Sequence, residues 1–145
     1  MWDIEEIPDD ATLYRRVPGH LIIDGEVGSD AFQNTSNTTQ MSTNWSLYAT
    51  AEETREQVTA FGKDPKTYGV VAMSVADVKR KIITAPQTID HCPDEALRNR
   101  AHTHVTGRKK KATQEEFVEI APLCLHPASN SSSPSTPPIG KAEAP

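Results

Sequence analysis

The sequence predicts an α+β domain, a small mixed β-sheet with about three short helices, followed by a C-terminal tail. Short β-branched and aromatic runs alternate with helix-capping patterns along most of the chain. The near-continuous apolar run at 68–74 is typical of a strand covered on both faces. Residues 127–145 are mostly proline, serine and other small or polar residues, and bury too little apolar area to offset the entropy of ordering them. We therefore expect a single domain over residues 1–121 and a disordered tail over 122–145.

The N-terminal third contains several short strand patterns. The first, rich in β-branched and aromatic residues, stops at Pro18-Gly19. Asp24-Gly25 stands between two short apolar runs, and both residues tolerate the positive φ that a tight hairpin turn requires. A polar stretch at 33–40 reads as a loop. We expect strands at 12–17, 20–23, 26–27 and 41–45.

Capping patterns mark the helices. Thr50 is followed three residues later by Glu53, and such a pair closes a helix N-terminus by reciprocal hydrogen bonds. Ser74 precedes the second helix, and Thr113 with Glu116 suggests the start of a third. We expect helices at 50–61, 75–81 and 113–121, and further strands at 68–74 and 101–106.

The net charge of −5 gives the whole molecule no electrostatic attraction for nucleic acid. The basic residues between 98 and 111 nevertheless form a run, which keeps a nucleic-acid contact as an alternative. This run holds no aromatic side chain on which a base could stack. We expect Lys109–Lys111 to lie at a solvated loop tip. The six basic residues are Arg98, Arg100, Arg108, Lys109, Lys110 and Lys111.

Nothing in the sequence predicts contact with a membrane. The acidic start lacks the basic and apolar regions of a signal peptide. The longest apolar-dominated stretch, 68–76, is far shorter than the ~20 residues that span a bilayer. Two cysteines, Cys92 and Cys124, suit a reducing compartment in which neither is paired. We expect a cytoplasmic protein.

Two histidines and two arginines are the candidate ligand-binding residues. His102 and His104 stand two apart in a predicted strand, so both project from one face. Arg15 and Arg16 lie on the first strand. If the first and the late strand are neighbours, all four converge on one cationic patch, and such patches favour phosphate or carboxylate ligands.

Metal binding and catalysis are not expected. His91 and Cys92 are the nearest additional nitrogen and sulfur donors, and their spacing to His102 and His104 matches no zinc pattern. Cys92 as a nucleophile would need a base, and adjacent side chains of extended chain point to opposite faces, which excludes His91. We therefore expect no metal, no cofactor and no catalytic residue.

Two resemblances add to this interpretation. Arg15-Arg16, then Ser42-Thr43, then Glu52 and Glu53 resemble the arginine, serine-threonine, glutamate order of ADP-ribosyltransferase-like domains, in which the first-strand arginine holds a dinucleotide phosphate or ribose and the glutamate polarises a ribose hydroxyl. Glu95 is a later candidate for this glutamate. The order of segments over 1–107 also resembles a family of short bacterial single-domain proteins without an assigned function.

These patterns favour a small non-enzymatic binding or accessory protein that acts through a protein partner or a small anionic ligand. The alternatives are an ADP-ribosyltransferase-like enzyme and a protein that contacts nucleic acid.

Overall fold

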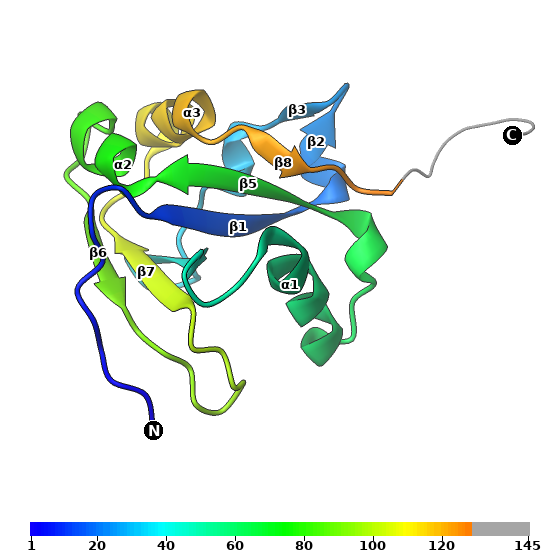
Figure 1. Cartoon of the computed structure of the whole chain (residues 1–145). Helices are drawn as coiled ribbons and strands as arrows, with labels where there is room; N and C mark the ends of the chain where they lie inside the picture. The colour runs from blue at the N-terminus through cyan, green and yellow to red at the C-terminus, as the bar shows by residue number, and fades with distance from the viewer. Residues whose placement is uncertain (129–145) are drawn as a thin grey trace, which may run out of the picture.

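A computed structural model describes residues 1–128 of the chain (Figure 1). The α+β class predicted from the sequence is confirmed. The helices are α1 (Ala51–Glu56), α2 (Val75–Lys81) and α3 (Lys111–Ile120). The strands are β1 (Thr12–Pro18), β2 (Ile22–Ile23), β3 (Glu26–Val27), β4 (Gln40–Trp45), β5 (Tyr68–Ser74), β6 (Thr88–His91), β7 (His102–Thr106) and β8 (Leu123–Leu125).

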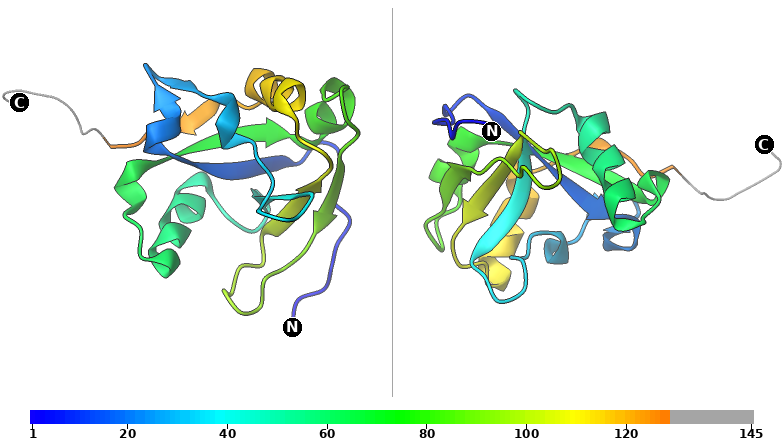
Figure 2. Two further views of the ribbon diagram at one scale, coloured as in Figure 1. Left: turned by 180° about the vertical axis from the view of Figure 1, so that it is seen from behind. Right: turned by 90° about the horizontal axis from the view of Figure 1, so that it is seen from below.

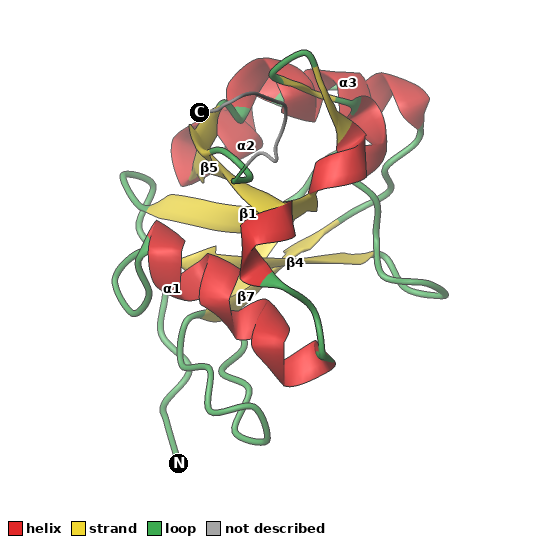
Figure 3. Cartoon of the chain, turned by 90° about the vertical axis from the view of Figure 1, so that its right-hand side faces the viewer, coloured by secondary structure: helices red, strands yellow, loops and turns green. Residues whose placement is uncertain are grey.

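Six strands form one sheet in the order β6-β7-β4-β1-β5-β8, and β2 and β3 form a separate hairpin. The pairings between these strands are antiparallel. Helices α2 and α3 lie on one face of the sheet and α1 on the other (Figures 1 and 3). We call these the α3 face and the α1 face.

The two middle strands share only a short seam. β1 and β4 are partners at just two positions, Leu13 with Trp45 and Tyr14 with Asn44. By contrast, β1 and β5 are paired over the whole length of both strands. Seen from below, β4 lies between β7 and β1, and β1 diverges from it (Figure 2). The sheet therefore consists of two three-stranded halves, β6-β7-β4 and β1-β5-β8, that separate beyond the seam.

The main hydrophobic core lies between the sheet and the α3 face helices. Alternate residues of the strands point into it, because successive side chains of a strand face opposite sides. Phe32 and Phe117 stack with ring centroids 5.7 Å apart at its centre. The fully buried core side chains include Leu13, Val17, Phe32, Met41, Met73, Val75, Val78, Val105 and Phe117.

Local sequence signals explain most elements. Thr50 and Glu53 form the expected capping box, with reciprocal hydrogen bonds of 2.9 and 3.0 Å. The chain continues from α1 as a 3-10 helix, η3 (Gln57–Phe61), and ends at Gly62, whose φ of 73° favours glycine. Asp24 and Gly25 both have positive φ, as the predicted hairpin requires. These predictions are confirmed.

Three boundaries differ from the sequence predictions. Helix α3 begins at Lys111 without a side-chain cap, so Thr113 is not its N-cap; its hydroxyl contacts that of Thr84 instead. Strand β6 forms in a segment predicted as loop. β8 lies beyond the expected domain end at 121, where its pairing with β5 offsets the entropy of ordering a short segment. The expected tail at 122–145 is thus wrong for β8, and residues 129–145 lie outside the described part.

Candidate functional site

The strand register gathers polar side chains on the α1 face. Ser42 is the partner of His104, and Asn44 is the partner of His102, across β4 and β7. Arg16 belongs to the same face of β1, because it lies two residues from Tyr14, the partner of Asn44. Helix α1 packs beside β1 and β5 on this face. The β6-β7-β4 half therefore presents its polar side chains beside α1.

A cleft with a volume of about 260 Å³ opens at this place. We call it the Arg16–His102 cleft. A smaller cavity of about 60 Å³ continues it between β1 and β4, where the two strands diverge. Two exposed apolar side chains, Phe61 and Leu97, stand at its rim with exposed fractions of 56% and 50%. The cleft is lined by Arg16, Ser42, Gln57, Thr59, Ala60, Phe61, Asp94, Leu97, Asn99 and His102.

Arg16 brings a positive charge to the cleft without a carboxylate partner among residues 1–128. One terminal nitrogen, Nη1, donates to the main-chain oxygen of Thr54 at 3.2 Å and to Oε1 of Gln57 at 3.1 Å. Burial lowers the pKa of the guanidinium below its ordinary value. Asp94, on the opposite wall, instead accepts a hydrogen bond from the main-chain nitrogen of Leu97. The guanidinium of Arg16 is thus partly desolvated, and Asp94, which lines the same cleft, forms no ion pair with it.

Side-chain amides hold the floor of the cleft. Nδ2 of Asn44 donates to Oγ1 of Thr54 at 3.0 Å and to Oε1 of Gln57 at 2.9 Å. Nδ2 of Asn99 in turn donates to Oδ1 of Asn44 at 2.8 Å. This network connects β4, α1 and the loop before β7, and it is not evident from the sequence, because its members are far apart in the chain. These hydrogen bonds hold Gln57 and Asn99, which line the cleft, in place relative to Arg16.

Arg15 does not join the other candidate residues. Its side chain lies on the α3 face, where it donates to main-chain oxygens of Ala31 at 2.8 Å, Ser42 at 2.8 Å and Gln33 at 3.2 Å. Burial, together with the charge of Arg16, lowers its pKa to about 10. Of the four predicted residues, Arg16 and His102 line one cleft and His104 lies beside His102, whereas Arg15 is excluded because adjacent side chains of one strand face opposite sides. Arg15 instead bridges the gap between β1 and β4.

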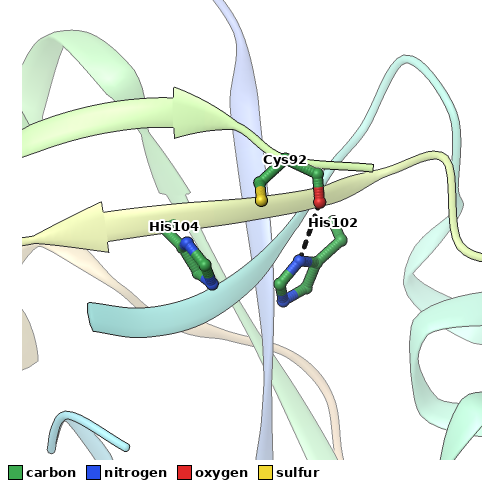
Figure 4. A group of neighbouring side chains, drawn as sticks. All are labelled: Cys92, His102 and His104. Atoms are coloured by element: carbon green, nitrogen blue, oxygen red, sulfur yellow. Dashed lines mark hydrogen bonds between the residues drawn. The ribbon is translucent and has the colours of Figure 1, made fainter. Parts of the chain in front are cut away.

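His102 and His104 form a compact pair on β7, on the α1 face of the sheet. The rings of His102 and His104 are 4.7 Å apart and nearly perpendicular. Nδ1 of His102 lies 2.9 Å from the main-chain oxygen of Cys92 and therefore donates to it, while Nε2 lies 3.3 Å from Oγ of Ser42 (Figure 4). The pKa of His104 is lowered by burial and by the charge of His102, against the opposing effect of Asp90.

Cys92 lies beside the two histidines, although its spacing from them in the sequence matches no zinc pattern. Its main-chain nitrogen donates to the main-chain oxygen of His102, so the pairing of β6 with β7 continues to this residue. The signal for β6 was the alternation in Thr88-Ile89-Asp90-His91 between two prolines. A strand at 88–91 that pairs with the strand at 102–106 places Cys92 opposite His102.

The basic run does not form one exposed surface. Lys109 is 8% exposed, and its ammonium donates to Oδ1 of Asn34 and the main-chain oxygens of Val105 and Gly107. The expectation that Lys109 lies at a solvated loop tip is wrong; Lys110 and Lys111 are exposed. A lysine buried in this way cannot contact a phosphate backbone.

The glutamates of the ADP-ribosyltransferase-like pattern lie apart from Arg15. Glu53 closes the capping box at the start of α1, and Oε2 of Glu95 accepts a hydrogen bond from the main-chain nitrogen of Trp2. Ser42 directs its hydroxyl toward His102 on the α1 face, whereas Arg15 lies on the α3 face. Arg15 therefore does not meet the other residues of the pattern, whereas Arg16 shares its cleft with Ser42 and Asp94.

No model of a known protein family matches the chain, and neither does any curated protein or solved structure. Among the helices of residues 1–128, none has the length and apolar character needed to cross a membrane.

Proposed function

We propose that the protein is a small, non-enzymatic cytoplasmic binding protein with an accessory role, and that the Arg16–His102 cleft holds an anionic ligand. The observation that carries this proposal is the uncompensated charge of Arg16. A desolvated cation costs free energy unless it is paired, and a carboxylate or phosphate in the cleft would supply the missing pair.

The donors around the cleft suit an anion. Arg16 has further guanidinium N–H groups beyond the Nη1 contacts to Thr54 and Gln57. Guanidinium groups bind carboxylate and phosphate oxygens through two parallel hydrogen bonds. His102 and Ser42 add polar groups on the opposite side of the same space. An oxyanion placed between Arg16 and His102 would be contacted from both halves of the sheet.

The rim favours a ligand that is more than a bare anion. Phe61, from η3, and Leu97, from the loop before β7, both line the cleft and expose apolar area there. Small-molecule sites commonly combine apolar walls with a few placed polar groups. An anion that carries an aromatic or aliphatic body would contact the rim as well as Arg16.

Binding of inorganic phosphate and of phenyl phosphate, measured by NMR titration of the full chain, tests this proposal. We expect phenyl phosphate to bind more tightly, and Arg16→Gln to weaken both interactions by at least ~10-fold, which equals ~1.4 kcal/mol. Arg80→Gln is the matched control, because the side chain of Arg80 is 74% exposed on α2, away from the cleft. Equal binding by the wild type and Arg16→Gln would contradict the proposal.

A further inference from the structure

A second cluster, formed by Cys92, His102 and His104, lies beside the cleft and has the composition of a metal site. One ligand atom from each residue lies within 4.8 Å of both others. Figure 4 shows the thiol and the two imidazole rings gathered on one face of the sheet. All three side chains are partly buried, so the protein restricts their positions and an ion can still reach them from solvent.

The backbone holds these side chains in place before any ion arrives. His102 and His104 are two apart on β7 and share a face, and Cys92 is bonded to His102 across the strand pair. Directly opposite residues of an antiparallel pair have Cβ atoms about 4.5–5.5 Å apart. The hydrogen bond from the His102 ring to the main-chain oxygen of Cys92 further fixes the imidazole beside the thiol.

The donor set selects the class of ion. One thiolate and two imidazoles are the ligands of Zn²⁺ and of other borderline-soft divalent ions, whereas Mg²⁺ and Ca²⁺ require oxygen. Tetrahedral zinc, with bonds of about 2.0–2.3 Å, places its ligand atoms about 3.3–3.6 Å apart. The separation of up to 4.8 Å thus closes with side-chain movements of about 1 Å.

A nearby carboxylate adds to the attraction for a cation. Asp90 is the partner of His104 across β6 and β7, so it shares the face of the cluster, and its side chain is exposed. Its negative charge acts on the His104 ring. Cys92, His102, His104 and Asp90 therefore form two successive cross-strand pairs on one ribbon.

We propose that Cys92, His102 and His104 bind a divalent transition-metal ion of the zinc class at an open, three-residue site. On binding, the Cys92 thiol releases its proton to solvent and the sulfur coordinates the ion. The fourth position faces solvent and is left to water. The metal site shares His102 with the Arg16–His102 cleft, but it does not require the anion proposed there, because all three ligands lie on the β6-β7 ribbon.

Metal binding to the chelator-treated full chain tests the proposal. We expect one equivalent of Zn²⁺ to bind in calorimetry, and Co²⁺ to give a thiolate-to-metal charge-transfer absorption. Cys92→Ser and His104→Asn should each weaken Zn²⁺ binding by more than the ~10- to 100-fold that loss of a supporting partner causes. Cys92→Ser should also abolish the charge-transfer band. Circular dichroism checks that each variant is folded.

Cys124→Ser is the matched control, because Cys124 is the other free cysteine and lies on β8, at the opposite edge of the sheet. It should bind Zn²⁺ like the wild type. Zinc should also protect Cys92, but not Cys124, from a thiol reagent. Absence of a charge-transfer band, or equal zinc affinity of folded Cys92→Ser and the wild type, would overturn the proposal. Both measurements are made without an anionic ligand, so their outcome does not depend on the cleft.

Discussion

Replacing Arg15 by methionine separates the two adjacent arginines into a structural and a ligand-binding residue. Arg15→Met keeps most of the side-chain volume but removes the donors to Ala31, Gln33 and Ser42. Each hydrogen bond from a charged group contributes about 1.5–3 kcal/mol, so the three together contribute roughly 5 kcal/mol or more.

The opposing effect is the cost of burying the guanidinium. Burial, with the charge of Arg16, lowers the pKa of Arg15 from its ordinary value to about 10. At about 1.36 kcal/mol per pKa unit, that change corresponds to roughly 3 kcal/mol that methionine would recover. The net loss of unfolding free energy is therefore about 2 kcal/mol, which lowers Tm by roughly 6–10 °C for a domain of this size.

Urea denaturation and thermal melts of Arg15→Met and Arg16→Met make the comparison. Arg16→Met loses the two contacts of Nη1 and recovers the cost of burying a guanidinium, so its unfolding free energy should fall less than that of Arg15→Met, while phosphate binding should be lost. Arg15→Met should retain phosphate binding. The reverse pattern, with Arg16→Met unstable and Arg15→Met stable but unable to bind, would refute the assignment of the two residues.

Two further predictions concern stability. The pKa of Lys109 is lowered from 10.5 to about 8, first by burial and second by the charge of Arg15, so between pH 8 and 10.5 the folded state binds fewer protons than the unfolded state. The unfolding free energy of the wild type should therefore rise with pH over this window by about 1–3 kcal/mol relative to that of Lys109→Met. Denaturant titrations at pH 7.5 and 10 measure this difference, with Lys110→Met as the exposed control. A difference in unfolding free energy that does not change with pH would contradict the lowered pKa of Lys109. A chain that ends after Ala121 loses β8 and should be less stable by about 1–2 kcal/mol than one that ends after Ala128, because Leu123 is partly buried against the core and contributes part of the ~1.5–3 kcal/mol of a fully buried leucine. Equal melting temperatures of the two truncated chains would show that β8 adds no stability.

Elements specified by local chemistry could be predicted from the sequence. The Thr50–Glu53 box, the turn at Asp24-Gly25 and the apolar run of β5 each act within a few residues, and each is found where it was expected. β6 and β8 are three or four residues long and are stabilised by pairing with distant strands, so their own sequences carry little signal. The start of α3 differs because Thr113 finds a partner in Thr84 rather than at the helix end.

The candidate site was predictable only in part for the same reason. That His102 and His104 share a face follows from their spacing alone. Which arginine joins them depends on the strand order, and this order places β4 between β1 and β7. Cys92 became a neighbour of His102 only through β6. The burial of Lys109 required knowledge of Asn34, a residue from another part of the chain.

The short seam between β1 and β4 gives the two adjacent arginines different environments. Where two strands part, their facing main-chain groups lose each other as partners, and Arg15 takes one of them by bonding to the oxygen of Ser42. The Arg15 side chain thus takes the place of a main-chain hydrogen bond between β1 and β4, and it spans the opening between the two strands. Arg16, the next residue along, lines the opening from the other face. The two arginines thus occupy the divergence of β1 and β4 from both faces of the sheet, Arg15 as a partner of a main-chain oxygen and Arg16 as part of the cavity wall.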